Sequence, residues 1–564
     1  MGGGCLRNPK TISCRIRDPF IRTTRCGMRC PKTVWLGIVA IMMLASSVQA
    51  APGDTTRSLP SPSPCPQGLT YDGSQIWCVD RRSDFLYRVD PGNGAVTDSL
   101  PSPGYVPRGL TWDGTYLWCI DAGEEQVYAI DPETQIVERT IPCPVSRPSG
   151  LTWDGEYLWL ADYGDDQLHQ ISTEDGTTIM SLPAPSGDPC GLAFDGSYLW
   201  VSDRSKDEIY AVTPDTGAVV ITLHAPAPHA WGLAWDGSRL WNVDYQTDRI
   251  YEVVVRDGDP YARFEVKLED VEFIHQVRNY GPDTVKTLDV YLAIPENRDT
   301  QELIGPVVFD PEPDAIRTDK WGQKVAHFRF TDMPPSEATL VRMNASAKLY
   351  QVQYYVYPDQ VGTLDDIPAD IRGQYLVDDA KFALESSIIK NALEAAVGEE
   401  TNPYWIARNI YQYVIDHMEY ELAGGWNIAP MVLNRGNGSC SEYTFVYISL
   451  CRSAGIPARY AGSLVIRGDD ASYDEVFHRW VEVYLPNVGW IPVDPSRGDK
   501  RWSAQRANSF GYLNNRFLIT TVGGGGSEYL EWGYNANERW TSKGRCKVAV
   551  EAFAEWSPRP DVEE

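Results

Sequence analysis

Hydrophobic and polar residues alternate in short runs through the first half of the chain, and these runs recur with a fixed period. One pattern of glycine, leucine, a small residue, an aromatic residue, aspartate and glycine occurs five times at steps of 41 residues, at 68–73, 109–114, 150–155, 191–196 and 232–237. An apolar run ending in tryptophan follows each Asp-Gly pair: Trp77, Trp118, Trp159, Trp200 and Trp241. Asp-Gly between alternating runs predicts a β-hairpin with a type I′ turn, and two further runs per repeat predict four strands.

Four strands in about 40 residues is the size of one blade of a β-propeller. Residues 56–60 match residues 97–101 at the same offset of 41, whereas the last repeat stops at its third strand near Val255. We therefore predict a five-bladed propeller over residues 55–256, in which the N-terminal segment supplies the missing strand. The repeated Asp and Trp residues are expected to serve turns and blade packing.

The next 95 or so residues show another all-β pattern. Alternating runs at 262–268, 287–293, 324–330 and 339–343 are separated by turns rich in Pro and Asp. This pattern predicts an immunoglobulin-like β-sandwich over residues 260–356, without the paired cysteines of antibody domains. Its expected role is that of a spacer.

Helical periodicity appears only after a predicted linker at 355–371. One amphipathic helix carries Leu384, Ile388, Ala392 and Leu393, and a second is capped by Asn402 with Pro403 in its first turn. A third helix is predicted over 441–453 and ends at Gly455 and Pro457. Strands are expected at 477–484, 489–494, 510–522 and 545–553, and a mobile loop at 523–526. The mixed pattern predicts an α+β domain over residues 365–555.

The charge distribution separates the first 50 residues from the rest. They hold eight basic residues and one acidic residue, whereas the remainder carries a net charge of −34 within a total of −27. The apolar run at 34–45, between Arg29 and Lys32 on one side and Val48-Gln49-Ala50 on the other, predicts a signal peptide over residues 1–50, and translation can begin at Met28. A secreted, extracellular or periplasmic protein is expected, with an uncleaved N-terminal anchor as the alternative. The acidity of the remainder argues against nucleic acid as a partner, or a membrane surface once the signal peptide is removed.

Candidate chemistry begins at Cys440, where a Gly-rich turn runs into the third helix. Unpaired backbone N–H groups and the positive end of the helix dipole favour a thiolate at such a position. His478 begins a predicted strand, and Asp494 ends the next strand of the same hairpin. A histidine can deprotonate the thiol while a carboxylate fixes its tautomer, so the three residue types suit nucleophilic catalysis. Singly, each has a structural alternative: a core or disulfide cysteine, a buried histidine and a turn aspartate.

These motifs, Gly438-Ser439-Cys440, His478-Arg479-Trp480 and Gly489-Trp490 through Asp494-Pro495, together resemble those of the transglutaminase-like superfamily. The resemblance covers roughly residues 365–542. It implies a papain-like fold with Cys440 as nucleophile, His478 as general base and acid, and Asp494 as orienting residue.

The resemblance implies a thiol enzyme that cleaves or transfers amide acyl groups of peptides or proteins through a thioester, and a cysteine peptidase is favoured. The alternatives are a protein-glutamine cross-linking acyltransferase and a non-catalytic adhesion or scaffold protein whose propeller binds a protein or glycan. Cys440 and Trp426 are the two candidate oxyanion donors, through a backbone N–H and an indole N–H. No Cys-x-x-Cys or His-rich cluster occurs, so neither a metal nor a cofactor is predicted.

Overall fold

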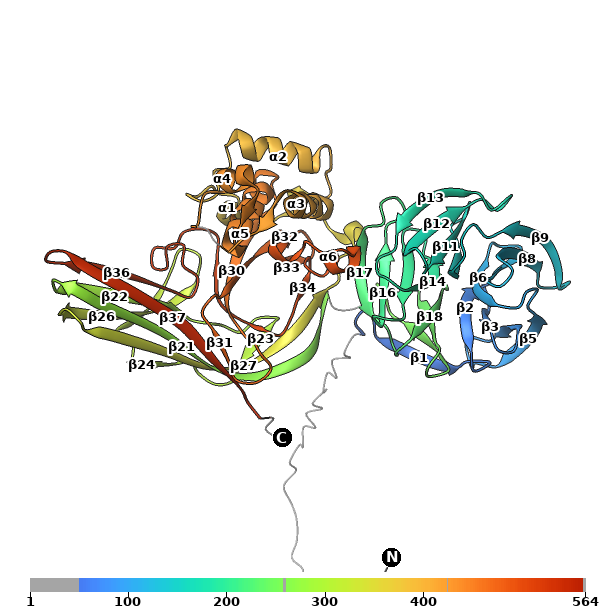
Figure 1. The fold of residues 1–564 in the computed structure, drawn as a ribbon, viewed down its shortest axis with the longest axis horizontal. Coiled ribbons are helices and arrows are strands. Elements are labelled where there is room, and N and C mark those ends of the chain that lie inside the picture. The colour runs from blue at the N-terminus through green and yellow to red at the C-terminus, as the bar shows by residue number, and fades with distance from the viewer. Residues whose placement is uncertain (1–49, 257–259, 423–424, 561–564) are drawn as a thin grey trace, which may run out of the picture. The chain divides into compact units, whose positions relative to one another are not determined.

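The computed structural model describes residues 50–256, 260–422 and 425–560 (Figure 1). The predicted signal peptide therefore lies almost wholly outside the described residues.

The 41-residue repeats form five antiparallel sheets of four strands each (Figure 1). The first contains β2 (Pro66–Tyr71), β3 (Ile76–Asp80), β4 (Phe85–Val89) and β5 (Val96–Pro101). The second contains β6 (Pro107–Trp112), β7 (Leu117–Asp121), β8 (Gln126–Asp131) and β9 (Ile136–Pro142). The third contains β10 (Pro148–Trp153), β11 (Leu158–Asp162), β12 (Gln167–Ile171) and β13 (Thr178–Pro183). The fourth contains β14 (Pro189–Phe194), β15 (Leu199–Asp203), β16 (Glu208–Val212) and β17 (Val219–His224), and the fifth contains β18 (Ala230–Trp235), β19 (Leu240–Asp244), β20 (Arg249–Val253) and β1 (Thr55–Pro60).

The N-terminal strand completes the fifth sheet, as its sequence predicts. β1 pairs antiparallel with β20, with Leu59 opposite Ile250. The first strands of different sheets meet backbone to backbone at glycines. A methyl group added at Gly68 would lie 2.5 Å from the carbonyl oxygen of Arg108, and one at Gly232 would lie 2.4 Å from that of Gln67. Only glycine fits at such distances. At this position of the repeat, the backbone of the first sheet therefore contacts the backbones of the second and the fifth sheets.

The Asp-Gly turns differ from the prediction. Gly73 has a φ of +93°, but Ser74 does not share the positive φ that a type I′ turn needs at both central residues. The Asp72 carboxylate organises the turn instead, because it accepts hydrogen bonds from the backbone N–H groups of Ser74 (2.9 Å) and Gln75 (2.8 Å). Its other oxygen accepts from the indole of Trp77 at 2.9 Å. The same bond recurs in the other four repeats, as Trp118–Asp113, Trp159–Asp154, Trp200–Asp195 and Trp241–Asp236.

Two larger antiparallel sheets share the next core. One contains β23 (Gln301–Leu303), β27 (Ala338–Tyr354), β21 (Tyr261–Pro282), β37 (Cys546–Pro558) and β31 (Ser472–Asp474), with β24 (Val308–Asp310) and β34 (Tyr512–Leu513) also paired to β27. The other contains β25 (Ala315–Thr318), β26 (Lys324–Met333), β22 (Val285–Ala293) and β36 (Ala536–Ser542). Phe273 of one sheet and Val290 of the other lie in a single buried cluster.

The sequence assigned the last strands to the α+β domain, and here the structure differs. β36 pairs with β22, and β37 pairs with β21 over most of its length. The sandwich is therefore not confined to residues 260–356, because its sheets include strands from the C-terminal end. Period-2 alternation identifies a strand but carries no information about a partner that lies hundreds of residues away.

Between those strands lie the helices and a sheet of their own, which we call the α+β region (residues 358–523). Its helices are α1 (Ala369–Tyr375), α2 (Ser387–Val397), α3 (Pro403–His417), α4 (Ala429–Arg435), α5 (Cys440–Ser453) and α6 (Ser503–Ala507), with 3₁₀ turns at Pro358–Gln360, Leu364–Asp366 and Pro495–Arg497. Its sheet has the order β33 (Gly489–Val493), β32 (His478–Leu485), β30 (Ala458–Val465) and β35 (Phe517–Gly523), and β28 (Glu419–Tyr420) pairs with β29 (Asn437–Gly438). The predicted linker contains two of the 3₁₀ turns and the start of α1.

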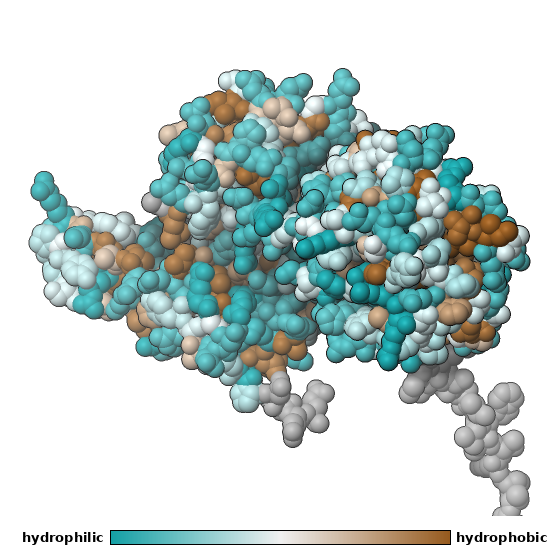
Figure 2. Space-filling model, turned by 45° about the vertical axis from the view of Figure 1, so that its right-hand side comes forward, coloured by the Kyte–Doolittle hydropathy of each residue, from teal (hydrophilic) through white to brown (hydrophobic). Residues whose placement is uncertain are grey.

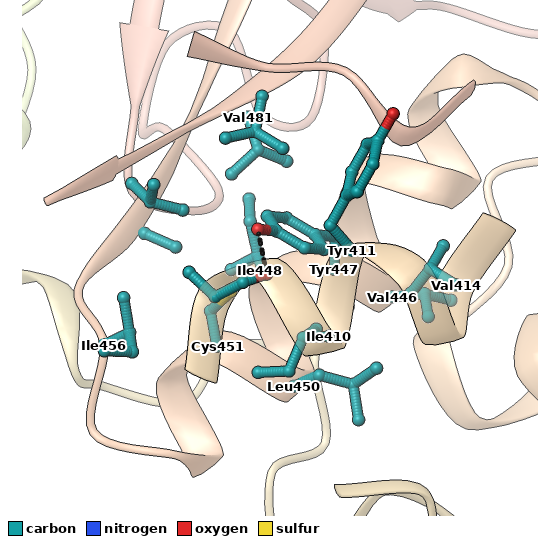
Figure 3. Close-up of a cluster of buried hydrophobic side chains, with 14 of the residues drawn as sticks. Ile410, Tyr411, Val414, Val446, Tyr447, Ile448, Leu450, Cys451, Ile456 and Val481 are labelled. Carbon is teal, nitrogen blue, oxygen red and sulfur yellow. Dashed lines mark hydrogen bonds between the residues drawn. The ribbon is translucent and has the colours of Figure 1, made fainter. Parts of the chain in front are cut away.

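The core of the α+β region surrounds α5 (Figure 3). Ile410 and Val414 of α3 pack against Val446 and Leu450 of α5, and Val481 of β32 belongs to the same cluster. Every residue of α5 except Ser453 is buried. Such a helix is held by its surroundings on all sides, so its first residue has a fixed position.

In the part of the chain that the structure describes, no helix combines the length and the apolar character needed to cross a membrane. On the face drawn in Figure 2, hydrophilic residues predominate and hydrophobic residues form separate patches.

Candidate active site

Cys440 is the first residue of α5 and is only 6% exposed. The N–H groups of the first helical turn have no partner within the helix, so they point toward the space in front of the thiol. The structure therefore gives Cys440 the helix N-terminal position that the sequence predicts.

Glu442 anchors this end of the helix and was not singled out by the sequence analysis. Its side chain is completely buried and accepts hydrogen bonds from the backbone N–H of Ser439 (3.1 Å) and of Asn427 (3.2 Å). Arg435 pairs with the same carboxylate at 3.0 Å. Ser439 and Glu442 have the spacing of a capping box, which is the sequence signal that identifies this residue.

His478 and Asp494 lie on neighbouring strands, as the hairpin predicts. Val481 of β32 is opposite Val493 of β33, and the imidazole Nε2 lies 2.7 Å from Asp494 Oδ2. The other oxygen of Asp494 accepts from the Ser496 hydroxyl at 2.6 Å. Because Nε2 faces the carboxylate, Nδ1 is the nitrogen that remains for the Cys440 thiol, with which His478 forms a side-chain hydrogen bond.

The charges of Cys440, His478 and Asp494 depend on one another. Burial raises the pKa of the Cys440 thiol, but the hydrogen bond and positive charge of His478 outweigh it and hold the pKa below the usual 9.0. Burial lowers the pKa of His478, but the Asp494 charge and hydrogen bond, together with Cys440, raise it to about 10. Burial raises the pKa of Asp494, but the charge and hydrogen bond of His478, together with the Ser496 hydrogen bond and the Arg497 charge, outweigh it and lower the pKa. The arrangement therefore favours an imidazolium beside a carboxylate, and it favours the thiolate form of Cys440 more than an isolated thiol would.

A second cation lies beside the thiol. Arg479 follows His478 and is fully buried, and its guanidinium carbon lies 4.3 Å from the ring centre of Tyr534, 4.7 Å from that of Tyr460 and 5.0 Å from that of Trp426. Burial lowers the pKa of Arg479, and the Cys440 thiolate is among the groups that raise it. Among the described residues it pairs with no carboxylate, and it donates to the carbonyl of Trp532. Only its place in the His-Arg-Trp motif marks this residue in the sequence.

Trp426 lies beside Arg479 and precedes the residue that is tied to the start of α5. Trp426 is 40% exposed, its carbonyl accepts from the Lys381 ammonium, and the next residue is tied to Glu442. Its role as an oxyanion donor stays a prediction. The predicted mobile loop at 523–526 packs closely, because a methyl group added at Gly524 would lie 2.5 Å from the Trp321 ring.

The eight cysteines of the described residues are all free thiols. Cys451 is fully buried in α5, where it belongs to the hydrophobic core, and burial raises the pKa of its thiol. No group of three or more metal-ligating side chains occurs among the described residues.

Comparison with known proteins identifies part of this region. Residues 390–495 match the family model of the transglutaminase-like superfamily, and the matched segment includes Cys440, His478 and Asp494. A Haemophilus influenzae protein named only as uncharacterized is 29% identical over 156 residues, which make up 22% of this chain and 42% of the relative. The uncharacterized Bacillus subtilis protein YebA is 38% identical over 71 residues, 11% of this chain and 10% of YebA. The chain thus spans less than half the length of either relative. A solved structure from Cytophaga hutchinsonii, whose name assigns it provisionally to the cysteine proteases, has a TM-score of 0.37 at 14% identity and covers 53% of this chain and 100% of that chain.

Proposed function

We propose that this chain is a cysteine-dependent enzyme that cleaves amide bonds of peptides or proteins through a thioester on Cys440. The observation that supports it is the charged network of Cys440, His478 and Asp494 at the start of a buried helix. The match of residues 390–495 to the transglutaminase-like superfamily supports a thiol enzyme. The choice of a peptidase over a cross-linking acyltransferase rests on the predicted export.

In the proposed reaction the Cys440 thiolate attacks the amide carbonyl, and a C–S bond forms as the carbonyl π electrons move to oxygen. N–H groups at the start of α5 stabilise the oxyanion. The imidazolium of His478 then gives its proton to the leaving amine while the C–N bond breaks. Water, deprotonated by His478, attacks the thioester and releases the acid, whereas a primary amine in its place would give transfer.

The proposed nucleophile is tested by treating the intact, unreduced protein with iodoacetamide at pH 6 and mapping the modified cysteines by mass spectrometry. We expect Cys440 to react at least tenfold faster than the half-buried Cys65 and Cys546, and to slow at least tenfold in His478→Ala. Cys440→Ala gives the background of the other seven thiols. Equal reaction at Cys440 and Cys65 would contradict the proposal.

Hydrolysis and transfer are separated by incubating the protein with casein and a fluorescent primary amine. A peptidase gives new α-amino groups with little fluorescence on casein, whereas an acyltransferase gives labelled casein. Whichever product the wild-type protein forms should be lost in Cys440→Ala, and the absence of both products from the wild-type protein would favour the adhesion or scaffold alternative.

The remaining parts are proposed as follows. We propose that the five repeat sheets form a closed five-bladed propeller, supported by the β1–β20 pairing and the glycine contacts between first strands. The sandwich is proposed to be immunoglobulin-like, and the protein to act outside the cytoplasm on a peptide or protein substrate. The support for export is the predicted signal peptide.

A further inference from the structure

Two positions of the 41-residue repeat carry side chains of different chemical types from one repeat to another. The residue before the first glycine of each repeat is Gln67, Arg108, Ser149, Cys190 or Trp231, and the residue after the aspartate that ends the second strand is Arg81, Ala122, Tyr163, Arg204 or Tyr245. These positions lie at the same end of each sheet, because Pro66 pairs with Asp80 and the N–H of Arg81 bonds to the Cys65 carbonyl. One scaffold position thus carries five different side chains, which is how a repeat protein builds a site on a regular frame.

Three arginines and three aromatic residues gather at this end, and we call them the arginine cluster (Arg81, Arg108, Arg204, Tyr163, Trp231 and Tyr245). The Arg204 guanidinium lies 4.9 Å from the ring centre of Trp231 and 5.6 Å from that of Tyr163. Arg108 belongs to the second sheet and Trp231 to the fifth. The Arg108 guanidinium lies 5.6 Å from the ring centre of Trp231. Tyr245 is 6.5 Å from Trp231 between ring centres and is 45% exposed, so the cluster reaches the surface.

Two hydrogen-bond donors of the cluster are buried without an acceptor among the described residues. Arg108 is 9% exposed and Trp231 7% exposed, and neither Arg108 Nε nor Trp231 Nε1 has a partner. The one side-chain bond of Arg108 runs from Nη1 to Gln67 Oε1 at 2.9 Å. Buried donors are paired in most proteins, and a buried donor without a partner is destabilising.

The charges of the cluster are also poorly matched. Burial lowers the pKa of Arg108, and repulsion from Arg81 and Arg204 lowers it further. Arg204 has a partner in Asp188 at 2.7 Å, but no carboxylate pairs with Arg108 among the described residues. The nearby Asp80 directs both oxygens to backbone N–H groups, those of Cys65 on one side and of Arg82 and Ser83 on the other. A cationic cluster of this kind is unexpected in a chain with a net charge of −27.

We propose that the arginine cluster binds a carboxylate group of a small ligand such as an acidic sugar. Arg108 Nε and Trp231 Nε1 supply hydrogen bonds to the carboxylate oxygens, and Arg204 supplies a second charge. A planar carboxylate suits the fork of a guanidinium, and the flat rings of Tyr163 and Tyr245 suit the apolar face of a sugar ring. The site belongs to the repeat sheets and does not depend on the thiol chemistry at Cys440.

Isothermal titration calorimetry of the full chain with D-glucuronate tests this proposal. We expect saturable binding of glucuronate, no binding of glucose, and an affinity at least tenfold lower in Arg108→Gln and in Arg204→Gln. Arg139→Gln removes an exposed arginine of β9 that donates to the Thr173 carbonyl, and should bind as the wild type does.

Thermal unfolding of each variant separates lost binding from lost folding, and the half-buried Arg204 serves if Arg108→Gln fails to fold. The rate of Cys440 alkylation should stay unchanged in all variants. Absence of glucuronate binding, or equal binding by Arg108→Gln and the wild type, would overturn the proposal. Tighter binding of inorganic phosphate than of glucuronate would overturn the assignment to a carboxylate.

Discussion

The carboxylate of Asp494 sets the charge state of the proposed nucleophile through His478. It is the main group that raises the pKa of His478, to about 10, and the imidazolium in turn lowers the pKa of Cys440. Because protonation of these groups is coupled, the pair titrates as a unit.

The pH dependence follows from these directions. As pH rises through the lowered pKa of Cys440, the thiolate forms, so alkylation should reach its plateau at a lower pH than it would for a thiol with the usual pKa of 9.0. Amide hydrolysis should fall again above a pH of about 10, because His478 then loses the proton that the leaving amine needs. Rates of iodoacetamide alkylation and peptide hydrolysis measured from pH 5 to 11 check the expected rise of alkylation and the expected fall of hydrolysis. A plateau that begins only above pH 9 would be inconsistent with an imidazolium partner.

Asp494→Asn should move the rise of the alkylation rate to higher pH. Without the carboxylate, the pKa of His478 falls toward its usual value, the imidazolium is lost at neutral pH, and the pKa of Cys440 rises. We expect alkylation at pH 7 to slow at least tenfold and its midpoint to move to higher pH, which the same pH series measures. Ser496→Ala, which removes only a hydrogen bond to the outer oxygen of Asp494, is the matched control and should shift the midpoint far less.

At the scale of elements, the start of α5 depends on Glu442. Glu442→Ala leaves Arg435 and the N–H groups of Ser439 and Asn427 without their acceptor. We expect the free energy of unfolding to fall by about 2–4 kcal/mol, measured by urea titration. Glu394→Ala, on the exposed face of α2, should change it by less than about 0.5 kcal/mol. Similar values for the two variants would show that the cap does not hold the helix.

The repeated Asp–Trp bond makes a similar prediction for the sheets. In Asp195→Asn the amide oxygen can still accept hydrogen bonds from the N–H groups of the turn. The amide NH₂ group then faces the Trp200 indole N–H, which lies in the core and loses its acceptor. The variant should be less stable by about 1–3 kcal/mol and unfold at a lower temperature in a thermal melt. Asp175→Asn, in an exposed turn, is the control, and an equal melting temperature for both variants would argue against the indole bond as a stabilising contact.

Local patterns predicted these elements well and their partners less well. The period of 41 residues identified all five sheets, and the motifs around Cys440, His478 and Asp494 identified residues that the structure brings together. Arg479 was missed because its aromatic neighbours Trp426, Tyr460 and Tyr534 come from separate parts of the chain. The Asp72–Trp77 hydrogen bond was not predicted, because the turn already accounted for Asp72 and blade packing already accounted for Trp77.

At the scale of the whole molecule, the sandwich contains strands from both ends of the segment that follows the repeats. β21 pairs with β27 on one side and with β37 on the other, so removal of β37 exposes a long edge and opens the shared core. The alternation of apolar and polar residues could not have predicted the pairing of β37 with β21, because the pairing depends on packing in the whole folded core.

A chain that stops after Gly544 should therefore lose stability far from the deletion. We expect a lower melting temperature, aggregation through the free edge of β21, and loss of the selective reaction at Cys440. Size-exclusion chromatography and the alkylation assay check these outcomes. A chain that stops after Pro560 retains β37 and is the control, and a Gly544 variant that behaves in the same way would contradict a structural role for β37.

β37 is synthesised long after its partner strand β21, which affects how the protein folds during synthesis. Roughly 15–60 s of synthesis separate the start of β21 from the start of β37 at about 5–20 residues per second. In the later part of that time the nascent chain already carries the Cys440 helix while one edge of β21 has no partner. The proposed enzyme can thus reach its complete fold only after β37 has been synthesised, so translation products that stop before β37 should lack an assembled active site.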